Sequence, residues 1–177
     1  MLYFISDTHF EEVRIQELFY GNDFFKSTDM YEAYMRARWK AKIRHDDDVI
    51  VVGDAGNPLA FADLPGNITL VRGNHDTYPD VSYSVFYSVV DNLNINAAGT
   101  RIIVEHINGS VNKPADIRIC GHSHNVESYM YVSPIDTTLY VIPNLLGYEP
   151  RTLEELLDNK YHTWSYEFMQ IRNNVFS

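Results

Sequence analysis

The chain has 177 residues, and its 14 Lys and Arg against 24 Asp and Glu give a formal net charge of −10. This length allows one domain with a sizeable core, and we expect residues 1–177 to form a single domain because no repeat or Gly/Ser-rich linker divides them. The negative charge argues against duplex DNA as a partner, since that binding requires several phosphates to be neutralised by Lys and Arg.

The first half of the chain contains short apolar runs and one long helical stretch. Residues 2–6 form an apolar run that ends abruptly in polar residues, which is typical of a buried strand, and residues 49–52 and 68–72 are further strand candidates. Between residues 28 and 44 an apolar side chain recurs every four positions, which predicts a helix with one buried face. Asn57-Pro58 predicts a helix N-cap followed by proline at the first helical position.

The second half contains three more strand candidates, at residues 101–105, 116–120 and 139–142. The segment Thr152-Leu153-Glu154-Glu155 is a capping box, which predicts the start of a late helix. Strands joined alternately by helices and short loops predict an α/β fold with a mixed sheet.

Polar residues follow five of these strand candidates. In open α/β sheets ligands bind beyond the carboxyl ends of the strands, so we expect these segments to converge on one site. In chain order the segments are Asp7-Thr8-His9, Gly53-Asp54, Gly73-Asn74-His75-Asp76, His106 and Gly121-His122-Ser123-His124.

Converging Asp, Asn and His side chains predict a metal site. Imidazole and carboxylate together suit Mn, Fe, Zn, Ni or Co, and the absence of cysteine ligands argues against a structural zinc site. One carboxylate can bridge two ions, and Asp54, central among the motifs, is the residue that we expect to do so. Two neighbouring ions can hold the attacking and leaving oxygens of a phosphoryl displacement.

These five motifs, in this order, resemble the calcineurin-like metallophosphoesterase family over roughly residues 2–156. The chain is especially similar to small bacterial and phage-type members, which begin with Asp-Thr-His-Phe, as residues 7–10 do, and end with a segment like Tyr148-Glu149-Pro150-Arg151-Thr152-Leu153. The resemblance implies an α/β metallophosphoesterase sandwich of two mixed β-sheets flanked by helices, with two metal ions at one end.

The resemblance also implies the role of each site residue. His75 would be the histidine outside both coordination shells that protonates the leaving oxygen or stabilises the developing charge, help that is typically worth about 10² to 10⁴ in rate. The metal ligands would be Asp7, His9 and His124 for the first ion, Asp54 as the bridge, and Asn74, His106 and His122 for the second.

The sequence departs from the family pattern in three places. Glu11-Glu12 stands where the small relatives have Gly-His, which places two acids near the first metal loop. Asn57 stands where one branch has an Asp, and an Asn can orient His75 but cannot stabilise its charged form as a carboxylate would. His106 lacks the His-x-Pro context often seen in the small relatives.

The leading hypothesis is a dinuclear metal-dependent phosphoesterase in which a metal-bound hydroxide attacks phosphorus. Manganese is the first choice of metal, with Fe, Zn, Ni or Co as alternatives. We expect a small phosphorylated substrate, with phosphodiesters preferred, because the net charge is negative and Arg72 is the one basic residue adjoining the motifs. The alternatives are a phosphomonoesterase or nucleotide hydrolase on the same site, a nuclease for single strands, and a non-catalytic protein-interaction module such as a retromer subunit of this fold.

The remaining residues predict no further site. Cys120 is the single cysteine, which predicts a buried inert thiol and a reducing, cytoplasmic environment. No apolar run approaches the roughly 18 residues that span a membrane, and residues 1–6 lack the basic stretch of a signal peptide. We interpret His45 and His162 as ordinary polar residues, and the basic run of residues 36–44 as a solvated helix face.

Overall fold

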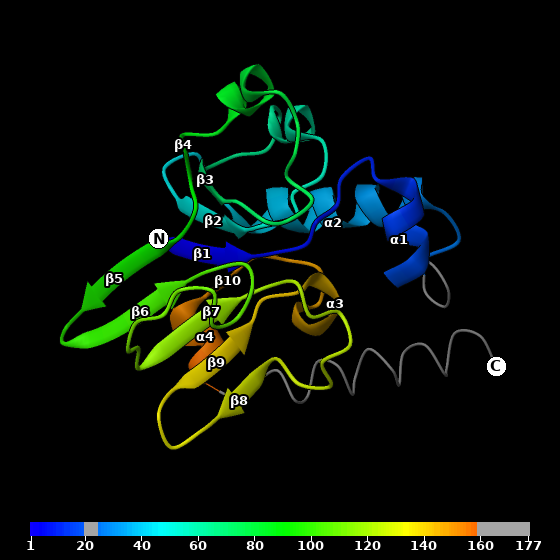
Figure 1. Cartoon of the computed structure of the whole chain (residues 1–177). Coiled ribbons are helices and arrows are strands. Elements are labelled where there is room, and N and C mark those ends of the chain that lie inside the picture. Colours follow the sequence, from blue (N-terminus) through cyan, green and yellow to red (C-terminus); the bar gives the residue numbers. More distant parts are fainter. Residues whose placement is uncertain (20–24, 159–177) are drawn as a thin grey trace.

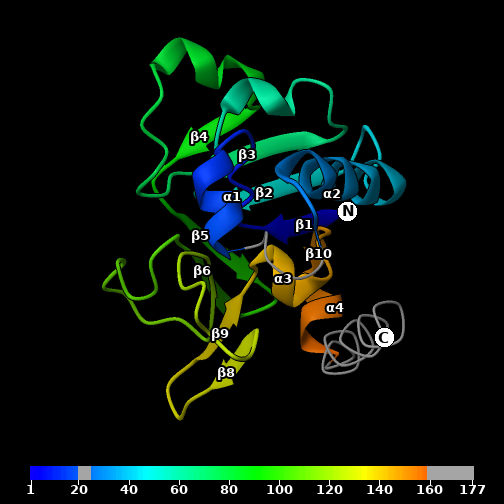
Figure 2. The same cartoon turned by 90° about the vertical axis from the view of Figure 1, so that its right-hand side faces the viewer.

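The strands form two five-stranded sheets that pack against each other (Figures 1 and 2). The computed structural model describes residues 1–19 and 25–158, so His162 lies outside the described residues. The first sheet has the order β10-β1-β2-β3-β4 and consists of β10 (Arg151–Thr152), β1 (Leu2–Ile5), β2 (Asp48–Val52), β3 (Asn67–Val71) and β4 (Ser88–Val90). The second has the order β5-β6-β7-β9-β8 and consists of β5 (Leu93–Ala97), β6 (Thr100–Val104), β7 (Ile117–Cys120), β9 (Thr137–Tyr140) and β8 (Met130–Val132).

Both sheets are mixed. In the first sheet β1 to β4 run parallel and β10 pairs antiparallel with β1. In the second, β6, β7 and β9 run parallel, and β5 and β8 pair antiparallel at the two edges. The predicted architecture of two mixed sheets flanked by helices is therefore confirmed.

Six helical segments of different lengths accompany the sheets. They are α1 (Val13–Phe19), α2 (Thr28–Lys42), α3 (Pro143–Leu146), α4 (Leu153–Leu157) and the 3-10 turns η1 (Pro58–Phe61) and η2 (Asp80–Val85), all within the described ranges. None of the described helices is long and apolar enough to cross a membrane.

The first sheet is buried on both faces, which explains its nearly continuous apolar strands. Tyr3 and Ile5 of β1 face a core shared with α2 and η1, whereas Phe4 between them faces the second sheet. The same alternation holds in β2, where Val51 faces α2 and Ile50 faces the second sheet. One run of apolar residues in each strand therefore supplies both cores and fixes the two layers.

The helix α2 follows the predicted four-residue spacing. The Ser27 hydroxyl caps it by accepting a hydrogen bond from Met30 N (3.2 Å), and Tyr31, Met35 and Trp39 are buried. The helix ends at Lys42, two residues before the predicted end, because Ile43 is already extended (φ −89°, ψ 135°).

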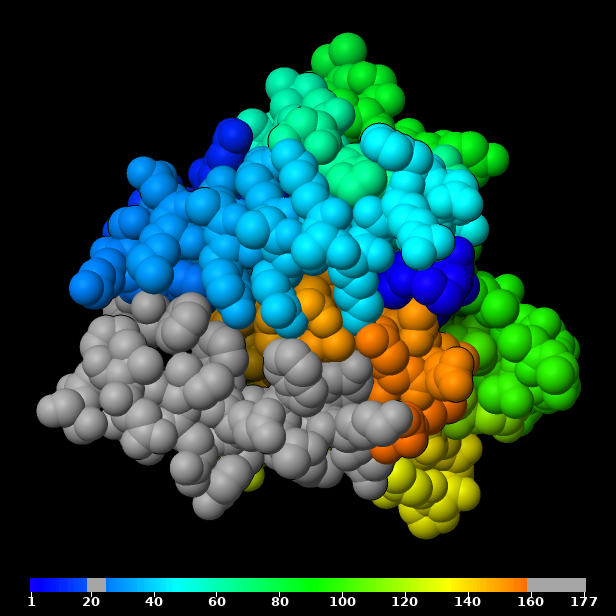
Figure 3. Space-filling model, turned by 180° about the vertical axis from the view of Figure 1, so that it is seen from behind, coloured from blue at the N-terminus to red at the C-terminus, as the bar shows by residue number. Residues whose placement is uncertain are grey.

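The basic run on α2 is paired with acids rather than free. Arg36 and Lys40 both contact Asp63, at 2.8 and 2.6 Å. Lys42 contacts Glu155 of α4 at 2.7 Å, and Figure 3 shows the light-blue α2 lying above the orange segment that carries α4. The interpretation of this run as an ordinary helix face fits these pairs.

Two predicted caps are present in the structure. Thr152 and Glu155 form the predicted capping box, in which each side chain accepts a hydrogen bond from the other residue's backbone N–H, so α4 begins at Leu153. Asn57 caps η1 through a hydrogen bond from Leu59 N (3.1 Å), but the element it opens is one four-residue 3-10 turn rather than a longer helix.

Candidate metal centre

The five predicted strand ends meet at one place between the two sheets. Asp7 N donates to Gly53 O (2.9 Å), which joins the loops after β1 and β2. His122 N donates to both oxygens of the Asp7 carboxylate (3.1 and 3.0 Å), which joins the loop after β7 to the first sheet. His106 Nδ1 donates to Val52 O (2.9 Å) and joins the loop after β6 as well. The expected convergence is therefore present.

The first cluster consists of Asp7, His9 and His124, whose candidate ligand atoms all lie within 4.8 Å of one another. His124 Nε2 lies 3.3 Å from Asp7 Oδ1, and His9 Nε2 lies 4.0 Å from the same oxygen. Asp7 and His9 are buried and His124 is half-buried. The structure thus brings together the three residues that the resemblance implied for the first ion.

The second cluster consists of Asp54, His106 and His122, again with candidate ligand atoms within 4.8 Å. Asn74 lies in the same place, because its Oδ1 is 3.1 Å from His106 Nε2 and 2.9 Å from His122 Nδ1. His106, whose sequence context was the least typical, is buried and well placed. All four residues implied for the second ion are therefore side by side.

Asp54 and His106 form a buried ion pair in the metal-free protein, with Oδ2 and Nε2 3.3 Å apart. Burial alone would raise the pKa of Asp54, but the hydrogen bond and charge of His106, together with the backbone N–H of His75, lower that pKa to about 2. Burial likewise opposes the charged form of His106, whereas the Asp54 hydrogen bond and the charges of Asp7 and Asp54 raise its pKa to about 9. The carboxylates therefore favour a positive charge in this space.

The residues around His9 fit a metal ion. The test is His9 Nε2, a buried nitrogen that makes no hydrogen bond within the described residues. It lies 4.0 Å from Asp7 Oδ1 and 3.8 Å from Asp54 Oδ2. Ligand atoms that share one ion through bonds of about 2.0–2.2 Å lie about 3–4 Å apart. A cation between these atoms would satisfy the nitrogen at the spacing already present.

Four of the clustered residues have left-handed backbone conformations. The φ angles are 49° at Asp7, 44° at His9, 51° at Asp54 and 67° at His122. Residues with a Cβ adopt this region rarely, although Asp and His do so more often than most, and such conformations are concentrated at functional sites. The sharp turns aim each side chain into the space between the strand ends.

Two glycines allow other loops to approach the carboxylates closely. A Cβ at Gly73 would lie 2.2 Å from Asp54 Oδ1, and a Cβ at Gly121 would lie 2.4 Å from Asp7 Oδ2. A side chain at either position would displace a candidate ligand, which explains why glycine precedes the polar residues of both motifs.

His75 lies at the edge of the first cluster. Its backbone N donates to Asp54 Oδ1 (2.9 Å), and its exposed ring meets the ring of His9 edge-on, with 5.6 Å between centroids. The structure places this side chain beside the predicted ligands and open to solvent, where a substrate oxygen can reach it.

The residues that depart from the family pattern form specific hydrogen bonds. The Asn57 side chain accepts from Leu59 N and donates to Glu11 Oε2 (2.5 Å), so its hydrogen bonds do not orient His75. Of the two acids expected near the first metal loop, Glu11 contacts Asn57 and Glu12 contacts His9.

Sequence reasoning assigned no role to Asp76, which holds the loops of the site together. This buried carboxylate accepts hydrogen bonds from the backbone N–H groups of Gly73 (2.7 Å), Asp54 (2.9 Å) and Ala55 (3.0 Å). Burial, followed by the charge of Asp54, raises its pKa, and the three N–H donors oppose that rise. Asp76 is the last residue of the Gly-Asn-His-Asp motif, and this position was the one feature of the sequence that could have indicated its role.

We expect Asp76→Ala to destabilise the metal-free protein by about 2–4 kcal/mol. The substitution leaves three N–H groups at buried or half-buried residues without their acceptor, and each such loss costs about 1–3 kcal/mol before water and relaxation reduce the sum. The measurement is the free energy of unfolding in denaturant. The matched control is Asp80→Ala, because the Asp80 side chain is 97% exposed and should change stability by less than about 0.5 kcal/mol. Equal stabilities of the two variants would contradict this role of Asp76.

The fold and the site together define a class of protein: an α/β sandwich with two adjoining candidate metal sites at the strand ends. A model of the calcineurin-like phosphoesterase superfamily domain matches residues 1–149. The chain belongs to the calcineurin-like phosphoesterase superfamily. No curated protein matches the chain in sequence.

The chain is similar to several solved structures. The chain is similar to a protein of unknown function from Aquifex aeolicus, with a TM-score of 0.71 and 21% identity over 89% of this chain and 98% of that one. It is also similar to a novel archaeal phosphodiesterase (TM-score 0.47, 17% identity, 78% of this chain and 81% of that one). The phosphoesterase Yfce from E. coli has a TM-score of 0.41 and 19% identity over 80% of this chain and 78% of that one. At these identities the Aquifex likeness supports the shared fold alone.

Proposed function

We propose that the chain is a dinuclear metal-dependent phosphoesterase that hydrolyses phosphodiesters. The observation that carries the proposal is the position of Asp54 Oδ2, which lies 3.3 Å from His106 Nε2 and 3.8 Å from His9 Nε2. One carboxylate oxygen thus stands between the two clusters, as a bridging ligand must. Membership of the calcineurin-like phosphoesterase superfamily supports the reaction class.

Mn²⁺ is our first choice for both ions, with Fe, Zn, Ni and Co as alternatives. The candidate ligands are imidazole, carboxylate and amide groups, which suit these ions. Cys120 is excluded as a ligand, because it is fully buried in the core and burial, followed by the charge of Glu105, raises the pKa of its thiol.

The positions of the side chains suggest a separate role for the metal ions, the carboxylates and His75. Two divalent ions would stabilise the phosphoryl oxygens and lower the pKa of a bound water. Asp7 and Asp54 supply buried negative charge that is fixed by backbone N–H donors. His75, exposed beside His9, can donate a proton to the leaving oxygen.

A cavity of about 370 Å³ adjoins the centre and suits a small phosphorylated substrate. It is lined by His122, Ser123, His124, Asn125 and Val126, so the substrate would enter beside candidate ligands of both clusters.

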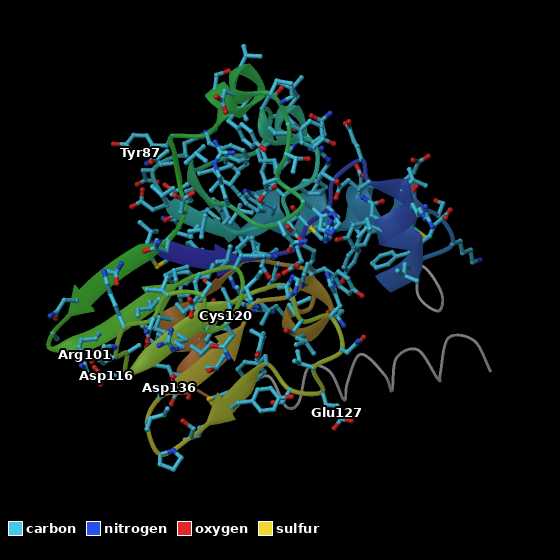
Figure 4. All side chains as sticks on the ribbon, viewed as in Figure 1. Tyr87, Arg101, Asp116, Cys120, Glu127 and Asp136 are labelled. Carbon is cyan, nitrogen blue, oxygen red and sulfur yellow. The ribbon has the colours of Figure 1, made fainter. Side chains whose placement is uncertain are left out.

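The charges around the centre favour a substrate with one negative charge. The guanidinium of Arg72 lies over the ring of Tyr83 and 3.6 Å from Asp80, so it is engaged with η2. Arg101 pairs with Asp116 at the opposite end of β6 and β7 (Figure 4). Glu12 adds negative charge directly behind His9. Arg72 and Arg101 are thus each held by an acid of their own, which leaves them less able to offset the second charge of a phosphomonoester.

We therefore expect kcat/KM for an aryl phosphodiester to exceed that for the matched monoester more than tenfold with Mn²⁺. Two charges about 8 Å apart interact by about 2 kcal/mol at an effective dielectric of 20, which is enough for that bias. High ionic strength should reduce the ratio, since screening weakens interactions that act through solvent. The measurement is the ratio at low and high salt. A monoester preference at both would overturn the charge argument and indicate a phosphomonoesterase.

A metal-supplemented screen tests the proposed reaction class itself. The purified protein is offered phosphodiesters, phosphomonoesters, nucleotides and short single strands, with Mn²⁺ and with a chelator. We expect hydrolysis with Mn²⁺ and its loss with the chelator. Metal binding without hydrolysis of any of these would contradict the enzyme proposal and favour a protein-interaction module.

A further inference from the structure

Glu12 contacts the histidine of the first cluster on the side away from the other candidate ligands. Its Oε2 lies 2.6 Å from His9 Nδ1, three residues earlier in the chain. The Glu12 side chain is 19% exposed and that of His9 1%, so water competes little for this hydrogen bond. Glu12 immediately precedes α1, and its backbone O accepts from Gln16 N (3.0 Å) in the first turn of that helix.

This contact determines which nitrogen of His9 carries the hydrogen. An ionised carboxylate only accepts hydrogen bonds, so Nδ1 must donate. The lone pair of the neutral ring is then on Nε2, the buried atom that faces Asp7 and Asp54 and makes no hydrogen bond within the described residues. Glu12 thereby leaves free the one atom of His9 that can bind a cation.

The helices α1 and α2 hold the backbone around the Glu12–His9 hydrogen bond. Gln16 Nε2 donates to His9 O and to Glu32 Oε1, each at 2.7 Å, and Glu32 Oε1 also accepts from Glu11 N at 2.6 Å. The Tyr31 hydroxyl donates to Thr8 O (3.1 Å). The segment that carries His9 and Glu12 is therefore anchored to α1 and α2 on both sides of the hydrogen bond.

In the second cluster, the Nδ1 of His106 has a different kind of hydrogen-bond partner from the Nδ1 of His9. His106 Nδ1 donates to the backbone oxygen of Val52, which is neutral, whereas His9 Nδ1 donates to a carboxylate. A carboxylate partner makes the imidazole a stronger base and brings negative charge to the ion. The outer partners of the two clusters are thus unequal, and Glu12 is the source of that difference.

We infer that Glu12 is a positioning residue of the first metal site: it fixes the His9 tautomer and ring, and it strengthens binding of the first ion alone. The inference rests on the metal centre of the proposed function, but not on the reaction or on the substrate.

The test combines two variants of Glu12 with a neighbouring control. Glu12→Ala removes the hydrogen bond and the charge, Glu12→Gln keeps an acceptor oxygen and removes the charge, and Glu11→Gln alters an adjacent acid that contacts Asn57 instead. The readouts are the affinity of each Mn²⁺, from chelator competition, and the His9 tautomer in the metal-free protein, from side-chain ¹⁵N NMR.

We expect Glu12→Ala to weaken the binding of one of the two ions by about 10–100-fold, the usual effect of removing such a partner. The variant should also no longer hold His9 in the tautomer with its hydrogen on Nδ1. Glu12→Gln should keep the tautomer and lose less affinity, and Glu11→Gln should change neither. Unchanged affinities in Glu12→Ala, or an equal loss at both ions, would overturn the inference. A selective loss in a protein that hydrolyses no phosphoester would support it while contradicting the proposed function.

Discussion

Asp54→Ala is expected to weaken binding of both metal ions, each by more than the roughly 100-fold that loss of an outer partner costs. The reason is the position of its carboxylate, which contacts His106 of the second cluster and lies near His9 of the first. Loss of the bridge also leaves His106 without its charged partner. The measurement is the metal content of protein loaded with excess Mn²⁺ and then desalted. We expect two ions in the unmodified protein and fewer than one in the variant.

Asn74→Ala is the comparison that separates a bridge from a terminal ligand. Asn74 Oδ1 contacts His106 and His122 of the second cluster only. This variant should therefore retain the first ion and lose the second. A content of one ion in the unmodified protein, or equal losses in the two variants, would contradict the dinuclear arrangement.

His75→Ala should leave both ions bound and lower turnover by about 10²-fold or more on a substrate with a poor leaving group. His75 touches the site through its backbone N–H and presents its ring to solvent beside His9. Removing the ring therefore takes away a proton donor without removing a predicted ligand. The loss should shrink on a substrate whose leaving group is already a good one, because that group needs less protonation.

His45→Ala is the matched control for His75. His45 is also an exposed histidine, but it follows α2 at the opposite end of β2 from Asp54. Its removal should change neither metal content nor turnover. Unchanged turnover of His75→Ala on the poor leaving group would remove this residue from the mechanism.

The convergence of the site was predictable because each motif directly follows an apolar run. Parallel strands bring their carboxyl ends to one edge, so the positions of Asp7, Asp54 and Asn74 could be predicted from the strand candidates alone. The roles of Glu12 and Asp76 could not. Each depends on how a turn directs a side chain, and those turns depend on backbone angles such as the φ of 63° at Glu11.

The elements that were missed are α1, η2 and β5, together with several shorter ones. The strands β4, β8 and β10 have two or three residues, too few for an alternating pattern to be recognised. The helix α3 is different, because its signals were present: Pro143 occupies its first turn, and Gly147 ends it with a left-handed φ of 69°. A four-residue helix between two such residues was recognisable from the sequence.

The left-handed turns at the centre set stability and metal binding against each other. A left-handed residue with a side chain costs on the order of 1 kcal/mol, so Asp7, His9, Asp54 and His122 together cost about 4 kcal/mol. That is a sizeable share of the roughly 5–15 kcal/mol that keeps a domain folded. Glycine would relieve this cost at each position and would remove a candidate ligand at the same time. Under the proposed function, selection for a more stable fold acts against these four side chains, whereas selection for metal binding retains them.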